Sequence, residues 1–464
     1  MKRSEFIRFN LLGSIGLLLK PITSFAVKEV QDVMYLSASN PDYNNIRRGF
    51  NTRINKFPKV VAVCYSEAGV VKAVQFARQQ NLPISIKSGG HCMEGFSTGE
   101  GSVQLVLSNL NKIVWIDDFT IQVGPGVLLK NLYETMIPKG KILPGGSCAT
   151  VAIGGLCLGG GYGLMSRLFG LTCDSLLSVS MVDGKAQLVS TKQDAELLWA
   201  CRGGGNGNFG VITSMTFKVH NRPKVMSSYR FRSYKTDKKR AASLLSEWMN
   251  QCKKLPKSCF STCLFNGDTV YILLTNVSAS KPEVQLFITT MKKLSDKTTM
   301  NLNQPLGTAL QNYYGQPHPV KFKNASAGLY NQFSEVQPFL DAALEKVFTT
   351  RGMIFQFNTL GGFIQDSTLE SQSSFPHRNY LFFTELQTYW DDEKQGALCL
   401  QRFEEVQQLI AATGVKAQYR NYPDINFKNP LALYYGKNLV RLKAIKAKYD
   451  PENRIRHEQS IGLL

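Results

Sequence analysis

The first part of the chain alternates between strand and helix patterns. Residues 59–65 form a short, nearly continuous apolar run, which is typical of a buried strand. Ser66 is a favoured residue at a helix start, and the apolar residues after it recur at helical spacing: Val70, Val71, Val74 and Ala77. Residues 83–87 then alternate as a second strand and lead into a glycine-rich turn at 88–91. We therefore expect this turn at a strand end, where ligand loops usually lie.

After residue 222 the pattern changes to strands in which polar and apolar residues alternate. Strands are expected at 229–234, 269–274, 353–358 and 380–390, and amphipathic helices near 281–296 and at 397–412. This mixture is typical of an antiparallel sheet with helices on one face. We predict an α+β fold with two domains, because 464 residues are also too many for one ordinary core.

The first 26 residues differ from the rest of the chain. Lys2, Arg3 and Arg8 precede an apolar run at 11–19, and small residues follow up to Ala26. This order is typical of an export signal cleaved after Ala26, and the run is too short to span a bilayer permanently. We expect a mature protein that is exported to the periplasm or secreted, without stable membrane insertion. Lys2-Arg3 also partly match a twin-arginine signal, with the spacing off by one residue.

Composition and charge narrow the classes of partner. With 43% hydrophobic and 19% charged residues, the chain is globular rather than disordered. A net charge of +20 would allow binding to nucleic acid or to an anionic envelope surface. The lysines are scattered, apart from short clusters such as 235–240, and no nucleic-acid recognition motif accompanies them. We expect a monomer with a solvated basic surface, weak attraction to anionic envelopes and no nucleic-acid partner.

The chain has ten cysteines, and export permits disulfides. Cys252, Cys259 and Cys263 lie close together, but no histidine is near them and their spacing fits no zinc pattern. We interpret them as a local disulfide or as buried thiols, and we predict no metal site.

Two short stretches combine a nucleophilic side chain with glycines. Ser88-Gly89-Gly90 precedes His91, and a second cluster containing Cys148 leads into the glycine-rich segment 154–163. Glycine lets the backbone turn sharply and bring its N–H groups close to a bound anion, so these stretches predict a pyrophosphate site. A dinucleotide motif of the nicotinamide type follows a strand and opens a helix. It does not fit here, because residues 141–144 are a poor strand.

Both stretches, in this order and with their neighbours, resemble the berberine-bridge-enzyme-like branch of the vanillyl-alcohol-oxidase superfamily, whose FAD-binding domain is of the PCMH type. The similarity is weakest between about 222 and 370, and it extends through 166–174, 198–213, 421–424, 434–438 and 449–461. The resemblance implies an FAD-binding domain at 27–221, a substrate-binding α+β domain at 222–414, and a C-terminal segment at 415–464 that returns to the FAD-binding domain.

In that family, the histidine after the first glycine pair bonds the 8α-methyl group of the flavin, and the cysteine before the second glycine cluster bonds C6. The resemblance therefore implies FAD attached through His91 and Cys148. The other cofactor-binding positions that match family motifs are Ser88, Gly89, Gly90, Val151, Gly154, Gly155, Gly160, Gly161, Tyr162, Gly163, Ile212 and Asn438. Val151 corresponds to the oxygen-gate position, where valine accompanies fast reaction with O2.

The chain offers Glu385 and Tyr422 as catalytic bases. A strand at 381–390 would point Phe383, Glu385 and Gln387 to one face, and Glu385 matches a functional position of plant relatives. A carboxylate against an apolar flavin face has its pKa raised toward working pH, as a general base requires. Tyr422 matches the tyrosine that acts as base, or orients the substrate hydroxyl, in carbohydrate-oxidising and phenol-oxidising members. Its ordinary pKa near 10 would need lowering, and the sequence leaves both candidates open, with Gln387 as a third catalytic residue.

Two departures from the family pattern make the expected site more apolar. Phe383 stands where monolignol-oxidising relatives have a lysine, and Phe169 stands where they have a tyrosine. Both changes put a cation-assisted tyrosine mechanism in doubt. His220 and His377 are interpreted as structural.

The resemblance therefore predicts an exported FAD-dependent oxidase that removes hydride from an alcohol or hemiacetal carbon and reduces O2 to H2O2. The expected substrate is a small molecule, either sugar-like or of polyketide or phenolic type. One alternative is a dehydrogenase that passes electrons to a quinone or protein acceptor. Another is a basic glycan- or envelope-binding protein whose flavin is structural.

Overall fold

The computed structural model describes residues 31–463, and residues 32–463 belong to one compact unit. The expected export signal at residues 1–26 lies outside the described residues. Among the residues described, no helix is both long enough and apolar enough to cross a membrane.

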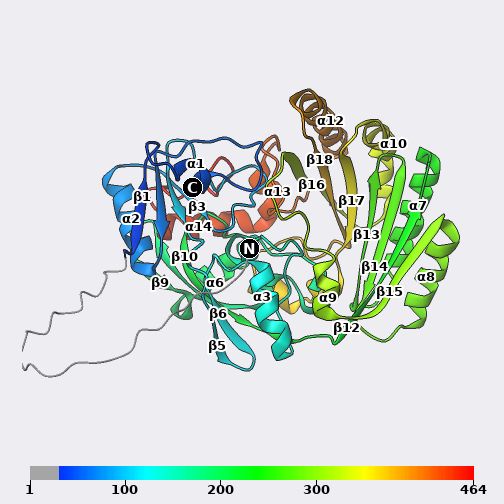
Figure 1. The fold of residues 1–464 in the computed structure, drawn as a ribbon, viewed down its shortest axis with the longest axis horizontal. Helices are drawn as coiled ribbons and strands as arrows, with labels where there is room; N and C mark the ends of the chain where they lie inside the picture. Colours follow the sequence, from blue (N-terminus) through cyan, green and yellow to red (C-terminus); the bar gives the residue numbers. More distant parts are fainter. Residues whose placement is uncertain (1–30, 464) are drawn as a thin grey trace, which may run out of the picture. The chain divides into compact units, whose positions relative to one another are not determined.

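The N-terminal layer of this unit is a four-stranded sheet (Figure 1). Its strands, in spatial order, are β1 (Val33–Leu36), β2 (Val60–Cys64), β4 (Val103–Val106) and β3 (Ile84–Lys87). β2, β4 and β3 are parallel, and β1 is antiparallel to β2. Helix α2 (Glu67–Gln79) packs on this sheet through Val70, Val74 and Ala77, as its spacing predicted. Its first turn is capped by Ser66, whose hydroxyl accepts a hydrogen bond from the backbone N–H of Gly69 at 3.0 Å.

A five-stranded antiparallel sheet forms the next layer. Its order is β5 (Ile113–Asp117), β6 (Thr120–Val123), β10 (Gly210–Lys218), β8 (Leu176–Asp183) and β9 (Leu188–Ser190), and β7 (Lys141–Ile142) pairs separately with β11 (His220–Asn221). Helix α1 (Tyr43–Arg47) packs against β2 of the first sheet. The α-helices between β4 and β10 are α3 (Leu129–Met136), α4 (Ile153–Leu158), α5 (Ser166–Phe169) and α6 (Ala195–Cys201). The largest buried cluster joins this layer to the C-terminal helices α13 (Pro430–Tyr435) and α14 (Leu439–Tyr449). The C-terminal segment therefore shares a core with residues from the first half of the chain.

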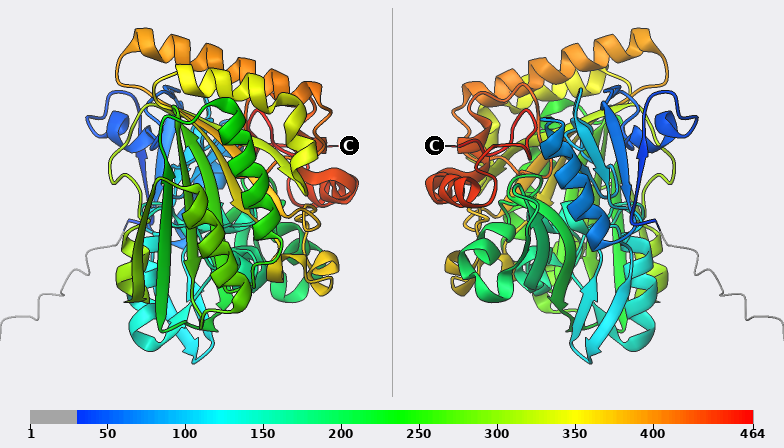
Figure 2. Two further views of the ribbon diagram at one scale, coloured as in Figure 1. Left: turned by 90° about the vertical axis from the view of Figure 1, so that its right-hand side faces the viewer. Right: turned by 90° about the vertical axis from the view of Figure 1, so that its left-hand side faces the viewer.

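The middle of the chain forms a seven-stranded sheet in which every pairing is antiparallel. Its order is β15 (Lys297–Pro305), β12 (Val225–Ser233), β14 (Thr269–Asn276), β13 (Cys259–Asn266), β17 (Met353–Thr359), β18 (Phe382–Tyr389) and β16 (Phe322–Tyr330). Four long helices cover one face of this sheet (Figure 2): α7 (Lys238–Cys252), α8 (Pro282–Leu294), α10 (Phe333–Thr349) and α12 (Glu393–Ala412). The short helices α9 (Leu306–Gln311) and α11 (Thr368–Gln372) lie in its connections. The predicted α+β class, with helices on one face of an antiparallel sheet, is confirmed.

Element boundaries differ from the predicted ones for local reasons. Helix α12 begins four residues earlier than the predicted start, because the Asp392 carboxylate accepts a hydrogen bond from the N–H of Gln395 at 2.8 Å.

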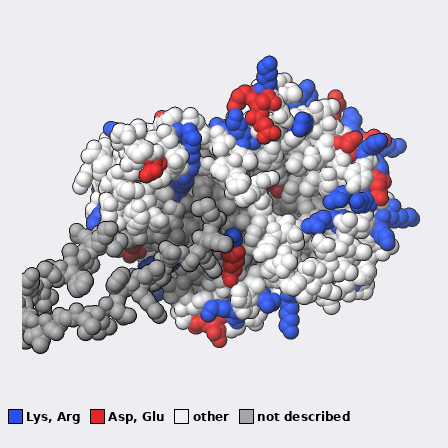
Figure 3. Space-filling model, viewed as in Figure 1, with Lys and Arg blue, Asp and Glu red and all other residues white. Residues whose placement is uncertain are grey.

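All ten cysteines are free thiols. Of the two interpretations of Cys252, Cys259 and Cys263, the structure therefore supports buried thiols and not a local disulfide. The domain boundaries at 221 and 414 stay predictions, since contacts join residues 32–463 into one unit. Figure 3 shows lysine and arginine side chains spread over the visible face, most densely near α7 and α8.

Candidate active site

One cavity of about 620 Å³ collects most of the predicted site residues. Its wall is made by the turn after β3, the segment before and within α4, the free face of the seven-stranded sheet, and residues 419–423. The predicted residues that line it are Ser88, Gly89, Gly90, His91, Cys148, Val151, Gly154, Gly155, Tyr162, Gly163, Ile212, Glu385, Gln387 and Tyr422. The structure therefore brings both anchoring candidates and all three catalytic candidates to one cavity.

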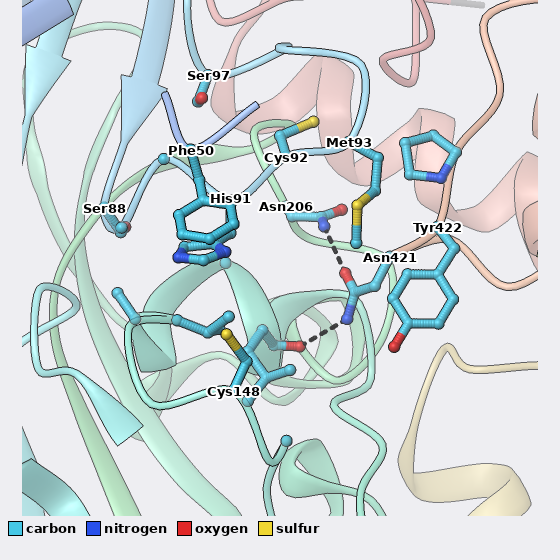
Figure 4. Close-up of a pocket in the computed structure, with 18 of the residues that line it drawn as sticks. Phe50, Ser88, His91, Cys92, Met93, Ser97, Cys148, Asn206, Asn421 and Tyr422 are labelled. Atoms are coloured by element: carbon cyan, nitrogen blue, oxygen red, sulfur yellow. Dashed lines mark hydrogen bonds between the residues drawn. The ribbon is translucent and has the colours of Figure 1, made fainter. Parts of the chain in front are cut away.

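His91 and Cys148 meet at a single hydroxyl group. His91 Nε2 lies 3.0 Å from Thr150 Oγ1, and Cys148 Sγ lies 3.7 Å from the same oxygen. His91 Nε2 and Cys148 Sγ are thus no further apart than the sum of these two distances. Phe50 stacks on the imidazole with ring centroids 4.2 Å apart, and Figure 4 shows the cysteine sulfur directed toward that ring. Burial lowers the pKa of His91 to about 4, against a smaller upward effect of the Thr150 backbone, so the imidazole is neutral at pH 7.

The turn between β3 and His91 has the form of an anion cradle. The backbone N–H groups of Gly89, Gly90 and His91 have no hydrogen-bond acceptor among residues 32–463. Gly90 has φ +73°, and a Cβ on Gly89 would come within 2.7 Å of the backbone nitrogen of Ala152. Glycine is therefore required at both positions, and the three free N–H groups are available to a bound anion.

The remaining features also fit a bound FAD. A Cβ on Gly155 would meet no atom within 4 Å, so this part of α4 faces open space in the cavity. Two arginines, Arg420 and Arg456, line the cavity and supply positive charge for a pyrophosphate. Neither arginine was predicted from the sequence, although Arg420 directly precedes the Asn421-Tyr422 motif.

Three predicted cofactor residues do not line the cavity. Gly160 and Gly161 form the turn behind it, with φ values of +117° and +84°, and the Tyr419 hydroxyl accepts a hydrogen bond from the N–H of Gly161 at 3.1 Å. Asn438 donates its side-chain N–H to the Ser374 carbonyl at 3.1 Å. In this structure the two glycines shape the turn and Asn438 holds the C-terminal segment, and their contact with the cofactor stays a prediction.

Glu385 is buried on the cavity face of β18. Asn324 and Asn358 each donate a side-chain N–H to one of its carboxylate oxygens, both at 3.2 Å. Burial raises the pKa of Glu385 to about 7, and the two amide hydrogen bonds act in the opposite direction. The carboxyl group is therefore half ionised near neutral pH, which suits a general base.

A chain of hydrogen bonds extends from Glu385 along the cavity wall. The Gln356 amide donates to Asn358 Oδ1 at 2.8 Å, and Gln387 donates to Gln356 Oε1 at 3.3 Å. The chain ends at Tyr389, whose hydroxyl donates to Gln387 Oε1 at 2.9 Å. Every donor in this chain points toward the glutamate, so the wall beside the base is polar and carries no further charge.

Tyr422 lies against aromatic rings. Its ring centroid is 5.7 Å from that of Phe383 and 5.2 Å from that of Tyr419. Burial raises the pKa of Tyr422 well above its usual value, and Glu385 and neighbouring tyrosines raise it further. The described residues place no cation where it would lower this pKa, so the tyrosine keeps its proton.

A buried ion cluster lies behind these groups. Lys323 Nζ is 3.2 Å from Glu94 Oε1 and 2.7 Å from Asp424 Oδ1, and Arg53 contacts the second oxygen of Glu94 at 2.7 Å. Lys323 precedes Asn324 on β16, and Asp424 closes the Tyr422 loop. The cluster therefore joins the strand that holds the base to the loop that holds the tyrosine.

The two histidines interpreted as structural lie outside the cavity lining. His220 stacks on Phe169 with centroids 4.5 Å apart, and its Nε2 lies 3.0 Å from Ser175 Oγ. His377 is buried among aromatic side chains, with Phe375 and Tyr380 at its edges.

Comparison with known proteins adds independent findings. A family model described as FAD binding domain matches residues 58–192, and one described as berberine and berberine like matches residues 418–462. The "Uncharacterized FAD-linked oxidoreductase YgaK" of Bacillus subtilis is 30% identical over 443 residues, which cover 92% of this chain and 96% of that protein. "Berberine bridge enzyme-like 17" of Arabidopsis thaliana is 29% identical, over 92% of this chain and 88% of that protein.

Solved structures share the fold. The BBE-like 1 protein of Physcomitrella patens superposes with a TM-score of 0.83 at 23% identity, covering 93% of this chain and 97% of that one. A chitooligosaccharide oxidase superposes with a TM-score of 0.84 at 22% identity over the same shares of the two chains.

Proposed function

This chain belongs to the berberine-bridge-enzyme-like FAD-linked oxidoreductases, and we propose that it is an exported oxidase with FAD bonded to both His91 and Cys148. It would remove hydride from an alcohol or hemiacetal carbon and pass the electrons to O2, giving H2O2. The observation that carries the proposal is the contact of both nucleophiles with the Thr150 hydroxyl in one cavity. The two expected attachment points lie on the same ring edge of the flavin, so their partners must converge in this way.

In this proposal, bound FAD supplies the electron acceptor and the chain supplies the proton acceptor. Glu385 takes the proton of the substrate hydroxyl, because burial raises its pKa to about 7 while leaving the ionised form accessible. Tyr422, which keeps its proton, donates a hydrogen bond to the substrate oxygen instead of acting as base. Gln387 belongs to the polar wall that orients the substrate.

The cavity wall favours a neutral, hydroxyl-rich substrate. Amide groups of Gln356 and Gln387 and the hydroxyl of Tyr389 bind hydroxyl groups well, and Glu385 would repel an anionic substrate. Proteins with this fold include a carbohydrate oxidase from Microdochium nivale and aclacinomycin oxidoreductase. Sugar-like substrates and substrates of polyketide or phenolic type are therefore the first to test, by anaerobic bleaching of the flavin.

Val151 supports O2 as the acceptor, since this small side chain lines the cavity at the oxygen-gate position of the family. The alternative is a dehydrogenase that passes electrons to a quinone or protein. Reoxidation of the substrate-reduced flavin in air within seconds supports the oxidase, and reoxidation that requires an added quinone supports the dehydrogenase.

The proposed anchoring is tested by mass spectrometry of the denatured protein. The wild-type chain should stay yellow after acid precipitation and carry one FAD linked to peptides containing His91 and Cys148. His91→Ala and Cys148→Ala should each retain one link. Release of all flavin from the wild type and both variants would exclude covalent attachment. A protein that binds acidic polysaccharide, and whose flavin no substrate bleaches, would favour the alternative of a structural flavin.

Export is proposed from residues 1–26, and the mature chain is proposed to be a monomer with only weak attraction to anionic envelopes. An N-terminus at Val27 in protein recovered from the periplasm or medium supports export. Recovery of the full chain in the cytoplasm alone would exclude it.

A further inference from the structure

We propose that Thr150 is the positioning residue for both flavin anchors, because its hydroxyl joins the His91 imidazole and the Cys148 thiol in one hydrogen-bonded unit. The inference rests on the proposed attachment of FAD to these two side chains. Thr150 orients both nucleophilic side chains before either of them bonds to the flavin.

The position of Thr150 is fixed by the backbone around it. The Ala149 N–H donates to the Tyr314 carbonyl at 3.0 Å, and the Lys130 N–H donates to the Ala149 carbonyl at 3.1 Å. The Leu129 N–H donates to the Val151 carbonyl at 2.9 Å. Since both neighbours of Thr150 are held in this way, the backbone that carries its hydroxyl group is fixed.

One assignment of donors and acceptors around Thr150 orients both anchoring side chains. If His91 Nε2–H donates to Thr150 Oγ1, the Nδ1 lone pair is free, and Nδ1 has no partner among residues 32–463. The Thr150 hydroxyl then directs its own hydrogen toward Cys148 Sγ at 3.7 Å. This contact fixes the direction in which the sulfur points. One side chain thus selects the imidazole tautomer and orients the thiol.

Phe50 completes the arrangement. Its ring lies over the imidazole with an interplanar angle of 21°, and its backbone N–H donates to the Gly90 carbonyl at 2.9 Å. Stacking on Phe50 therefore fixes the plane of the imidazole ring, and the hydrogen bond to Thr150 fixes the rotation of the ring within that plane. A neutral ring is available for bonding, because burial keeps the pKa of His91 low.

The chemistry of attachment balances with dioxygen as the oxidant. Each bond replaces one flavin C–H and one N–H or S–H of the protein. Each bond formed releases two protons and two electrons, which dioxygen takes up as one hydrogen peroxide. Thr150 is neither consumed nor bonded, so its role is seen in the rate and extent of attachment.

The test measures attachment separately for each anchor. Cys148→Ala leaves only the histidine link and His91→Ala leaves only the cysteine link, so each serves as a one-anchor parent. Thr150→Val is introduced into both parents, and purified proteins are incubated with FAD in air and sampled by mass spectrometry. We expect attachment about tenfold slower than in the matching parent in both cases, the effect of losing one hydrogen bond. Thr150→Ser should restore the parental rate. Ser147→Ala, which removes a hydroxyl group of the cavity lining, should leave the rate unchanged.

Unchanged attachment in both Thr150→Val proteins would overturn the inference while leaving the proposed function intact. Absence of covalent FAD in the wild type would instead overturn the proposed attachment itself. Non-covalent FAD binding, measured by quenching of FAD fluorescence, shows whether Thr150→Val still folds. If Thr150→Val does not fold, the inference is tested by Thr150→Ser, which keeps the hydroxyl group. Attachment slower than in the parent in Thr150→Ser would overturn the inference.

Discussion

The pKa of Glu385 should depend on the two amides that donate to it. Asn358→Leu keeps the branched shape of the side chain but removes one N–H donor, which lies 3.2 Å from the carboxylate. A hydrogen bond to a charged group contributes about 1.5–3 kcal/mol, and one pKa unit corresponds to about 1.4 kcal/mol. The ionised form therefore loses support, and the pKa should rise by about 1–2 units from its present value of about 7.

The assay is the rate of flavin reduction under anaerobic conditions as a function of pH. Because the base must be ionised, the wild-type rate should rise through a pKa of about 7 and level off above it. In Asn358→Leu the rise should move up by about 1–2 units, with a rate at pH 7 that is about 5- to 50-fold lower. At a pH well above the new pKa, the rate should approach that of the wild type.

Gln356→Leu is the matched control. It removes the amide that donates to Asn358 Oδ1 at 2.8 Å but leaves both donors on the carboxylate. The apparent pKa of its flavin-reduction rate should stay within a few tenths of a pH unit of the wild-type value, even if substrate binding weakens. An unshifted rise in Asn358→Leu, with a rate reduced equally at every pH, would refute Glu385 as the titrating base.

Three further predictions concern the same wall. Glu385→Gln should abolish flavin reduction. The pKa of Glu385 is higher in the folded chain than in the unfolded chain, so its ionisation lowers the stability of the wild type as pH rises from 4.5 through about 7. Glu385→Gln removes this loss. In denaturant unfolding, the variant should therefore be more stable than the wild type by up to about 3 kcal/mol at pH 8 and almost equally stable at pH 4.5. Tyr422→Phe should slow reduction about tenfold at every pH without moving the rise, and a shifted rise would make the tyrosine the base. Lys323→Met should destabilise the fold by about 3–5 kcal/mol, because it leaves Asp424 without a cationic partner in the buried cluster and Glu94 with Arg53 alone. An unchanged unfolding midpoint would contradict this.

Local patterns were sufficient where one element determines its own geometry. The period of two along β18 predicted that Phe383, Glu385 and Gln387 share a face, and the structure places all three in the cavity. The helix after Ser66 and the strand before the turn at 88–91 were also predicted from local spacing. The convergence of His91 and Cys148 was available only from the family resemblance, because no spacing rule brings residues so distant in the chain together.

The partners of these groups could not be predicted, because they come from other elements. Asn324 lies on β16, which the pattern did not reveal: all nine of its residues are buried, so the strand lacks polar–apolar alternation. Thr150 looks like an ordinary loop residue until the fold brings His91 beside it. Gly160 and Gly161 were predicted to contact the cofactor because they match a family motif, and the structure adds that their positive φ values form the turn behind the cavity.

The sheet register explains how Glu385 acquires its properties. Glu385 pairs with Gln356 on β17 and with Ser326 on β16. Asn358 and Asn324 each stand two residues from those partners, and diagonal neighbours on one face of a sheet lie within reach of each other. A one-residue slip of β18 would move the glutamate into the apolar layer beneath the helices, where Leu386 now packs. The same register that buries Leu386 therefore exposes the carboxyl group to the cavity and places an amide on each of its oxygens.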